Sequence, residues 1–186
     1  MNGLDILQKD HKRILVLVDE LARSAKATEG SHDEVVSKRV QRFDELRETL
    51  RQHIKIEEHV LFPDLQAFGE TKIPVDECYR EHKRINELLQ KIEHLTEEKH
   101  WDLWDNLCAE LERRVQTYLT REEDGLFPRA RLLLNDGQLE NMFFEIERIR
   151  SNQSETDSLI FPADRFGVGS KRHRTGSQPS AKSAKK

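Results

Sequence analysis

Apolar residues recur every three or four positions along four segments of the chain, which is the period of an amphipathic α-helix. These stripes cover residues 4–25, 36–60, 75–92 and 104–125. A fifth and weaker segment covers about residues 138–149. Because the connections between the four long segments are short, the pattern predicts an all-α, up-down-up-down four-helix bundle with a short extra C-terminal helix.

Signals for helix boundaries stand where the pattern breaks. Ser31 precedes Glu34 by three residues, which is the spacing of an N-terminal capping box. Pro74 suits the first turn of the third helix. The run Asn135-Asp136-Gly137 separates the fourth segment from the fifth. We therefore expect one helical domain over residues 1–150.

The chain also repeats itself. Residues 10–14 match residues 81–85, and residues 53–63 match residues 118–128, with offsets of 71 and 65 residues. We therefore expect two copies of one helical hairpin, related by an approximate two-fold axis. Equivalent positions of the two copies should then meet near the axis of the bundle.

Six polar residues stand at core-facing positions within the apolar stripes, and they form a candidate site. An unpaired carboxylate in a core costs several kcal/mol even after relaxation, and two carboxylates at one level repel each other. A pair of metal ions resolves both problems, because each carboxylate can bind two metals while imidazole and phenolate fill other positions. Histidine with carboxylate suits iron, zinc or manganese. The six candidate ligands are His11, His53, Glu57, His82, Tyr118 and Glu122.

Each of these residues taken alone has an ordinary interpretation. His11 alone would be a hydrogen-bonded core histidine, and Tyr118 alone would be a core aromatic with its hydroxyl at the surface. Glu57 or Glu122 alone would extend to solvent. All of these interpretations would have to hold together at equivalent places in two repeats, so the set favours a metal site. Four acidic neighbours are expected to be solvated or to orient ligands: Asp10, Glu58, Glu81 and Glu123.

Three motifs together resemble the hemerythrin-like, or HHE cation-binding, family over residues 4 to about 134. They are His11, the run from His53 to Pro63, and the pair Glu81-His82. The four-residue spacing of His53 and Glu57 argues against ferritin-like bundles, which use Glu-x-x-His. The resemblance implies a four-helix bundle that holds two non-haem iron ions with an oxo or hydroxo bridge.

The resemblance also implies roles for particular positions. Glu57 and Glu122 would bridge the two metals, His11 and His53 would serve one of them, and His82 would serve the other. Tyr118 stands where the family's fourth-helix motif begins with histidine. Three alternatives remain for it: a phenolate ligand, a neighbour of an open water-filled position, or the mark of a decayed site.

A second departure from the family pattern lies one turn before His82. There the chain has Cys78, where respiratory hemerythrins place a further histidine. One iron thus has two fewer imidazoles than in an oxygen carrier. A phenolate favours the ferric state, whereas reversible oxygen carriage needs a stable diferrous state, so Tyr118 argues against simple transport.

These observations support three functional hypotheses. The first is a redox-active di-iron protein that handles O2, peroxide or nitric oxide as a sensor, scavenger or weak oxidase. The second is a non-catalytic metal-dependent regulatory or interaction module, or an iron-binding protein. The third is a helical interaction protein without metal. The sequence leaves open whether the protein is an enzyme, and it has no phosphate loop of the G-x-x-x-x-G-K type.

Charge divides the chain into an acidic body and a basic tail. Residues 165–186 carry seven Lys or Arg and no acid, which leaves −11 on the rest of a chain whose formal net charge is −4. We expect residues 151–186 to form a disordered tail, able at most to touch nucleic acid weakly. No apolar run has the length of a membrane span, and the two cysteines build no framework of bridges. Both features predict a cytoplasmic protein without a membrane partner.

Overall fold

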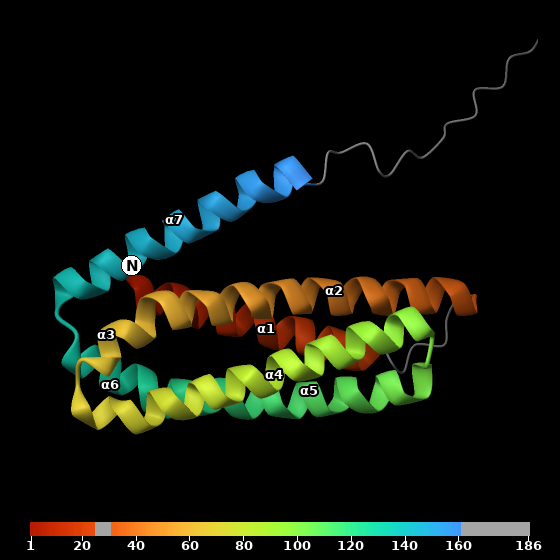
Figure 1. The fold of residues 1–186 in the computed structure, drawn as a ribbon, viewed down its shortest axis with the longest axis horizontal. Coiled ribbons are helices and arrows are strands. Elements are labelled where there is room, and N and C mark those ends of the chain that lie inside the picture. Colours follow the sequence, from red (N-terminus) through yellow and green to blue (C-terminus); the bar gives the residue numbers. More distant parts are fainter. Residues whose placement is uncertain (25–30, 161–186) are drawn as a thin grey trace, which may run out of the picture. The chain divides into compact units, whose positions relative to one another are not determined.

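The computed structural model describes residues 1–24 and 31–160. Within this described part every regular element is helical, and there is no β-strand. Residues Met1–Ser151 form one compact unit, which contains all six candidate ligands. Its four long helices lie side by side (Figure 1): α1 (Gly3–Ser24), α2 (His32–Ile56), α4 (Lys72–Glu98) and α5 (Trp101–Arg121).

Helices that follow one another in the chain are also neighbours in space. Helix α1 packs against α2 and α5, and α4 packs against α5 and α2. This ring of four neighbours confirms the predicted all-α bundle. Its core contains most residues of the predicted apolar stripes, together with residues beyond them such as Phe62 and Phe127. The largest fully buried side chains also include Trp104 and Phe43.

Local signals in the sequence set the helix ends. The hydroxyl of Ser31 accepts the backbone N–H of Glu34, and the Glu34 carboxylate accepts the backbone N–H of Ser31, so the predicted capping box is present. Helix α4 ends at Glu98, and the next residue, Lys99, adopts the left-handed conformation with φ 60°. The indole N–H of Trp104 then donates to the hydroxyl of Thr96 at 2.9 Å and ties α5 to α4.

A wide π-helical turn interrupts the helix at the same place in each repeat. These turns are η1 (Glu57–Leu61) and η3 (Glu122–Leu126), and they lead into the short helices α3 (Phe62–Gln66) and α6 (Phe127–Leu133). In each case a proline, Pro63 or Pro128, is the second residue of the short helix. Proline has no N–H and its ring collides with the carbonyl four residues earlier, so a wider turn relieves the clash. Each π turn begins at one of the two core carboxylates.

The C-terminal helix is longer than the sequence pattern predicts. The expected segment of about residues 138–149 lies within α7 (Asp136–Ile160). Residues after Ile149 lose the apolar period, but Pro162 is the first residue that opposes helix, and it disfavours helix for the residue before it. The short turn η2 (Gly69–Thr71) completes the described elements.

Two further expectations concern regions beyond the bundle. Of the tail expected over residues 151–186, residues 151–160 belong to α7, and residues 161–186 lie outside the described residues. Within the described part, no helix combines the length and apolar character needed to cross a membrane.

Candidate metal centre

All six predicted ligands meet at one level of the bundle, near the end that carries the π turns. None of them is more than 3% exposed. Glu57 and Glu122 begin the two π turns, and the other four come one each from the four long helices. The structure therefore brings together every residue that the sequence singled out. They divide into two halves around the carboxylates.

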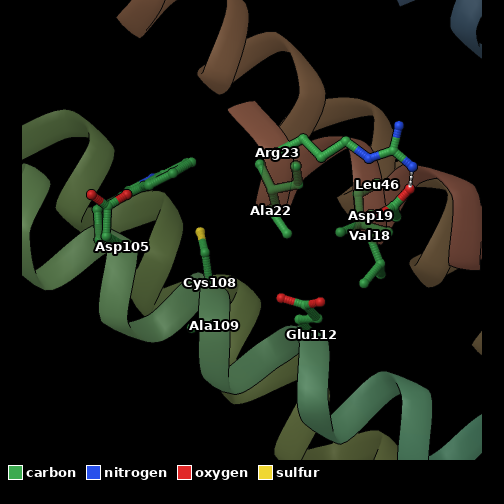
Figure 2. A pocket seen from close by; sticks show the side chains of 11 residues that line it. Val18, Asp19, Ala22, Arg23, Leu46, Asp105, Cys108, Ala109 and Glu112 are labelled. Carbon is green, nitrogen blue, oxygen red and sulfur yellow. Dashed lines mark hydrogen bonds and ion pairs between the residues drawn. The ribbon is translucent and has the colours of Figure 1, made fainter. Parts of the chain in front are cut away.

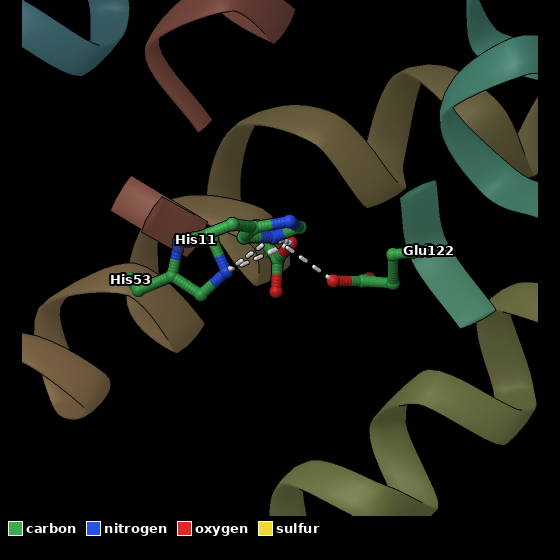
Figure 3. A group of neighbouring side chains, drawn as sticks. His11, His53 and Glu122 are labelled. Atoms are coloured by element: carbon green, nitrogen blue, oxygen red, sulfur yellow. Dashed lines mark hydrogen bonds and ion pairs between the residues drawn. The ribbon is translucent and has the colours of Figure 1, made fainter. Parts of the chain in front are cut away.

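The first half contains two imidazoles and one oxygen from each carboxylate. Nε2 of His11 lies 3.1 Å from Nε2 of His53. Oε1 of Glu57 lies 3.2 Å from Nε2 of His53, and Oε2 of Glu122 lies 3.4 Å from Nε2 of His11. Figure 3 shows the two rings beside each other with Glu122 opposite. One atom from each of the four residues falls within 4.8 Å of the others, which suits a shared cation.

The second half contains one imidazole, one phenol and one thiol. Nε2 of His82 lies 3.1 Å from Oε2 of Glu57 and 2.6 Å from the hydroxyl oxygen of Tyr118. The Tyr118 hydroxyl donates to Oε2 of Glu57 at 2.5 Å, so it points into the core and not to the surface. Sγ of Cys78 lies 3.6 Å from Oε1 of Glu122. The position where respiratory hemerythrins have a further histidine thus faces the site.

Each of the two carboxylates therefore presents one oxygen to each half. In the first half, Oε1 of Glu57 and Oε2 of Glu122 are buried and accept no hydrogen bond from any described residue. Such unsatisfied acceptors are costly in a core. They lie beside two imidazole nitrogens 3.1 Å apart that cannot both carry a proton. This donor set fits a cation, because an ion would accept electron pairs from all four residues.

The pKa values of the buried groups are shifted because two buried carboxylates lie close together with little positive charge beside them. Burial lowers the pKa of His11, but the carboxylates of Glu122 and Glu57, whose nearest oxygens lie 3.4 Å and 3.9 Å from its Nε2, outweigh burial and raise it to about 10. Burial also lowers the pKa of His82, but hydrogen bonds to Glu57 and Glu58 outweigh burial and raise it to about 9. Burial and the nearby charge of Glu57 raise the pKa of Glu122 to about 7. Protons and metal ions are thus alternative sources of positive charge at these positions.

The outer nitrogens of two histidines are held by carboxylates from the opposite hairpin. Nδ1 of His11 lies 2.8 Å from Oε1 of Glu123, and Nδ1 of His82 lies 2.8 Å from Oε1 of Glu58. A carboxylate on the outer nitrogen fixes the ring orientation and raises the basicity of the inner nitrogen. Of the two roles considered for these glutamates, the structure shows the orienting one. Sequence spacing did not indicate which histidine each would contact.

The two hairpins differ beside residue 118. In the first hairpin, Asp10 lies 3.8 Å from Nδ1 of His53 and accepts two hydrogen bonds from Arg150 of α7. Its counterpart in the second hairpin, Glu81, faces a helix that has Tyr118 in place of that histidine. Glu81 bonds instead to Arg114, at 2.7 Å. A tyrosine has no ring nitrogen that Glu81 could orient, so the Glu81 carboxylate accepts a hydrogen bond from Arg114 instead.

Another pocket lies between α1 and α5, away from the six candidate ligands. Figure 2 shows Cys108 and Glu112 of α5 facing Ala22 of α1 across this pocket, which has a volume of about 340 Å³. It shares no lining residue with the metal-ligand cluster. This pocket is therefore separate from the candidate metal site, which lies at the π-turn end of the bundle.

Two paired helical hairpins with histidines and carboxylates at the axis form a helical bundle whose buried donor set can bind a cation. The family model of the hemerythrin HHE cation binding domain matches residues 2–130. The chain belongs to this family and carries a cluster that can bind metal. A search of the curated proteins found no matching relative.

Proposed function

We propose that the protein holds two non-haem iron ions and handles O2, peroxide or nitric oxide as a sensor, scavenger or weak oxidase. The observation that carries this proposal is the division of Glu57 and Glu122 between two donor sets. His11 and His53 would hold one ion, and His82 with Tyr118 would hold the other. When bound, the iron pair would supply one-electron redox steps and positions for a small ligand.

The surrounding residues suit this role. Glu123 and Glu58 orient His11 and His82 toward the centre. Stacked rings of Phe127 on His11 and Phe62 on His82 help to keep bulk water from the imidazoles. A dry, oriented set of donors strengthens electrostatic interactions within the site.

Tyr118 supplies the sharpest spectroscopic prediction. Burial and the nearby carboxylates raise the pKa of its hydroxyl well above 10, yet a ferric ion favours a deprotonated oxygen ligand. We expect the ferric protein to show a phenolate-to-iron charge-transfer band that Tyr118→Phe removes while iron is retained. Visible absorption with iron analysis measures both effects.

The chain offers a matched control for this measurement. It has two tyrosines, and the other one, Tyr79, packs on Phe62 outside the cluster. Tyr79→Phe should leave the band unchanged. Absence of the band in the wild-type protein, with an identical Tyr118→Phe spectrum, would contradict a phenolate ligand and leave Tyr118 as a core aromatic.

Turnover distinguishes this proposal from the second candidate. The unsatisfied oxygens of Glu57 and Glu122 also favour a metal-dependent regulatory module, because binding would stabilise the fold by itself. Release of O2 from hydrogen peroxide by the iron-loaded protein, without added reductant, supports peroxide scavenging. Binding of nitric oxide without turnover supports a sensor. Metal-dependent folding with neither response supports the regulatory module.

A further inference from the structure

A pocket between α4 and α5 connects the surface with the second half of the site. Its inner end is formed by the buried side chains of Cys78, Tyr118 and Glu122, and its volume is about 190 Å³. Pro74, Glu77, Arg121 and Arg129 form its outer part. This half also contains both departures from the family pattern, Cys78 and Tyr118.

The internal repeat shows that the opening is specific to the second hairpin. The repeat offsets of 71 and 65 residues make Leu7 the equivalent of Cys78 and Val60 the equivalent of Gly125. Leu7 is fully buried and Val60 is 8% exposed, so apolar side chains fill the equivalent space in the first hairpin. Gly125 lines the α4–α5 pocket, and a Cβ added to it would meet no atom within 4 Å.

Helix α7 closes the first hairpin at this level. Met142 packs so closely on Gly3 that a Cβ added to the glycine would lie 2.4 Å from the Met142 Cβ. Arg150 of the same helix bonds to Asp10. Within the described part of the chain, no equivalent helix packs over Gly125. Packed side chains therefore cover the first half of the site, whereas the α4–α5 pocket reaches the second half.

Size and charge define what the pocket admits. A volume of about 190 Å³ holds roughly six waters at about 30 Å³ each, which is below the range of about 300–1,000 Å³ typical of drug-sized ligands. Arg121 and Arg129 are exposed at its mouth, and neither forms an ion pair with a described residue. Glu77, Glu81 and Glu122 also line the pocket. Glu81 is paired with Arg84 and Arg114, and Glu122 is a proposed metal ligand, so among the described residues of the lining Glu77 alone opposes the two arginines with an unpaired negative charge. The balance favours a small anion of a few atoms.

We propose that this pocket admits a small anion to the Tyr118 half of the metal site, and that Gly125 keeps it open. The proposal rests on the proposed two-metal function and adds a further class of ligand and its route to the site. Arg121 and Arg129 attract the anion at the mouth. Cys78 and Tyr118 border the space that it reaches.

The test uses nitrite as the probe and zinc-loaded full-length protein, which is diamagnetic and suits NMR. Nitrite should cause saturable shifts of the backbone amides of Arg121 and residue 125. Gly125→Val introduces the residue of the equivalent position in the first hairpin, and it should abolish these shifts while zinc content stays at the wild-type level. Gly69→Val is the matched control, because a Cβ at Gly69 also meets nothing within 4 Å.

A second variant tests the charges without filling the pocket. Arg121→Gln combined with Arg129→Gln should weaken nitrite binding by about three- to tenfold, as expected for two exposed charges. Zinc analysis separates the two proposals. Fewer than two ions per chain would overturn the two-metal function and with it this inference. Two ions with no saturable shifts in the wild type, or with equal shifts in Gly125→Val, would overturn the pocket alone.

Discussion

Glu57→Ala is expected to lower the bound metal from about two ions per chain to one or fewer. Glu57 is the carboxylate whose oxygens lie nearest to imidazoles of both halves, at 3.2 Å from His53 and 3.1 Å from His82. Its removal takes a donor from each half and leaves two cations with less negative charge between them. Glu122→Ala should act in the same direction.

Elemental analysis after iron reconstitution measures this loss. Glu48→Ala is a suitable control, because Glu48 is an exposed glutamate on the same helix α2. Circular dichroism should confirm that each variant remains helical. Two spin-coupled irons in Glu57→Ala, seen by Mössbauer spectroscopy, would disprove the assigned bridge.

Metal loading is expected to raise the melting temperature by about 10 °C. A ligand that binds only the folded state at about 1,000 times its Kd adds roughly 4 kcal/mol to the free energy of unfolding. Each kcal/mol corresponds to about 2–4 °C in a domain of this size. The gain has a physical source in this protein, because Glu57 and Glu122 are buried with oxygens that accept no hydrogen bond from described residues.

Calorimetry of the metal-free and metal-loaded forms measures this difference. Glu57→Ala should lose most of the increase, whereas Glu48→Ala should keep it. An equal increase in the wild type and in Glu57→Ala would show that metal stabilises the protein at some other place.

Much of the fold was predictable, because the apolar period and the boundary residues act locally. The stripes gave the four long helices, and Ser31 with Glu34 gave the start of α2. The apolar period did not predict the π turns, because a single extra residue in one turn changes the spacing of apolar residues very little. Pro63 and Pro128, each two residues after a π turn, were the available signal.

The candidate site followed from the repeat, whereas its surroundings did not. Polar residues at equivalent core positions identified His11, His53, Glu57, His82, Tyr118 and Glu122 together. The pairing of Glu123 with His11 depends on how two distant helices pack, and the spacing of residues along one helix carries no such information. The closure of the first hairpin by α7 and the open pocket at Gly125 likewise arise from tertiary packing.

Iron analysis of the anaerobically reconstituted protein, joined to Mössbauer spectroscopy, tests the two-metal centre most directly. We predict about two irons per chain in a single spin-coupled pair, because Glu57 and Glu122 each present one oxygen to each half of the site. Well under one iron per chain in a fully helical protein, or one isolated iron, would contradict the proposal.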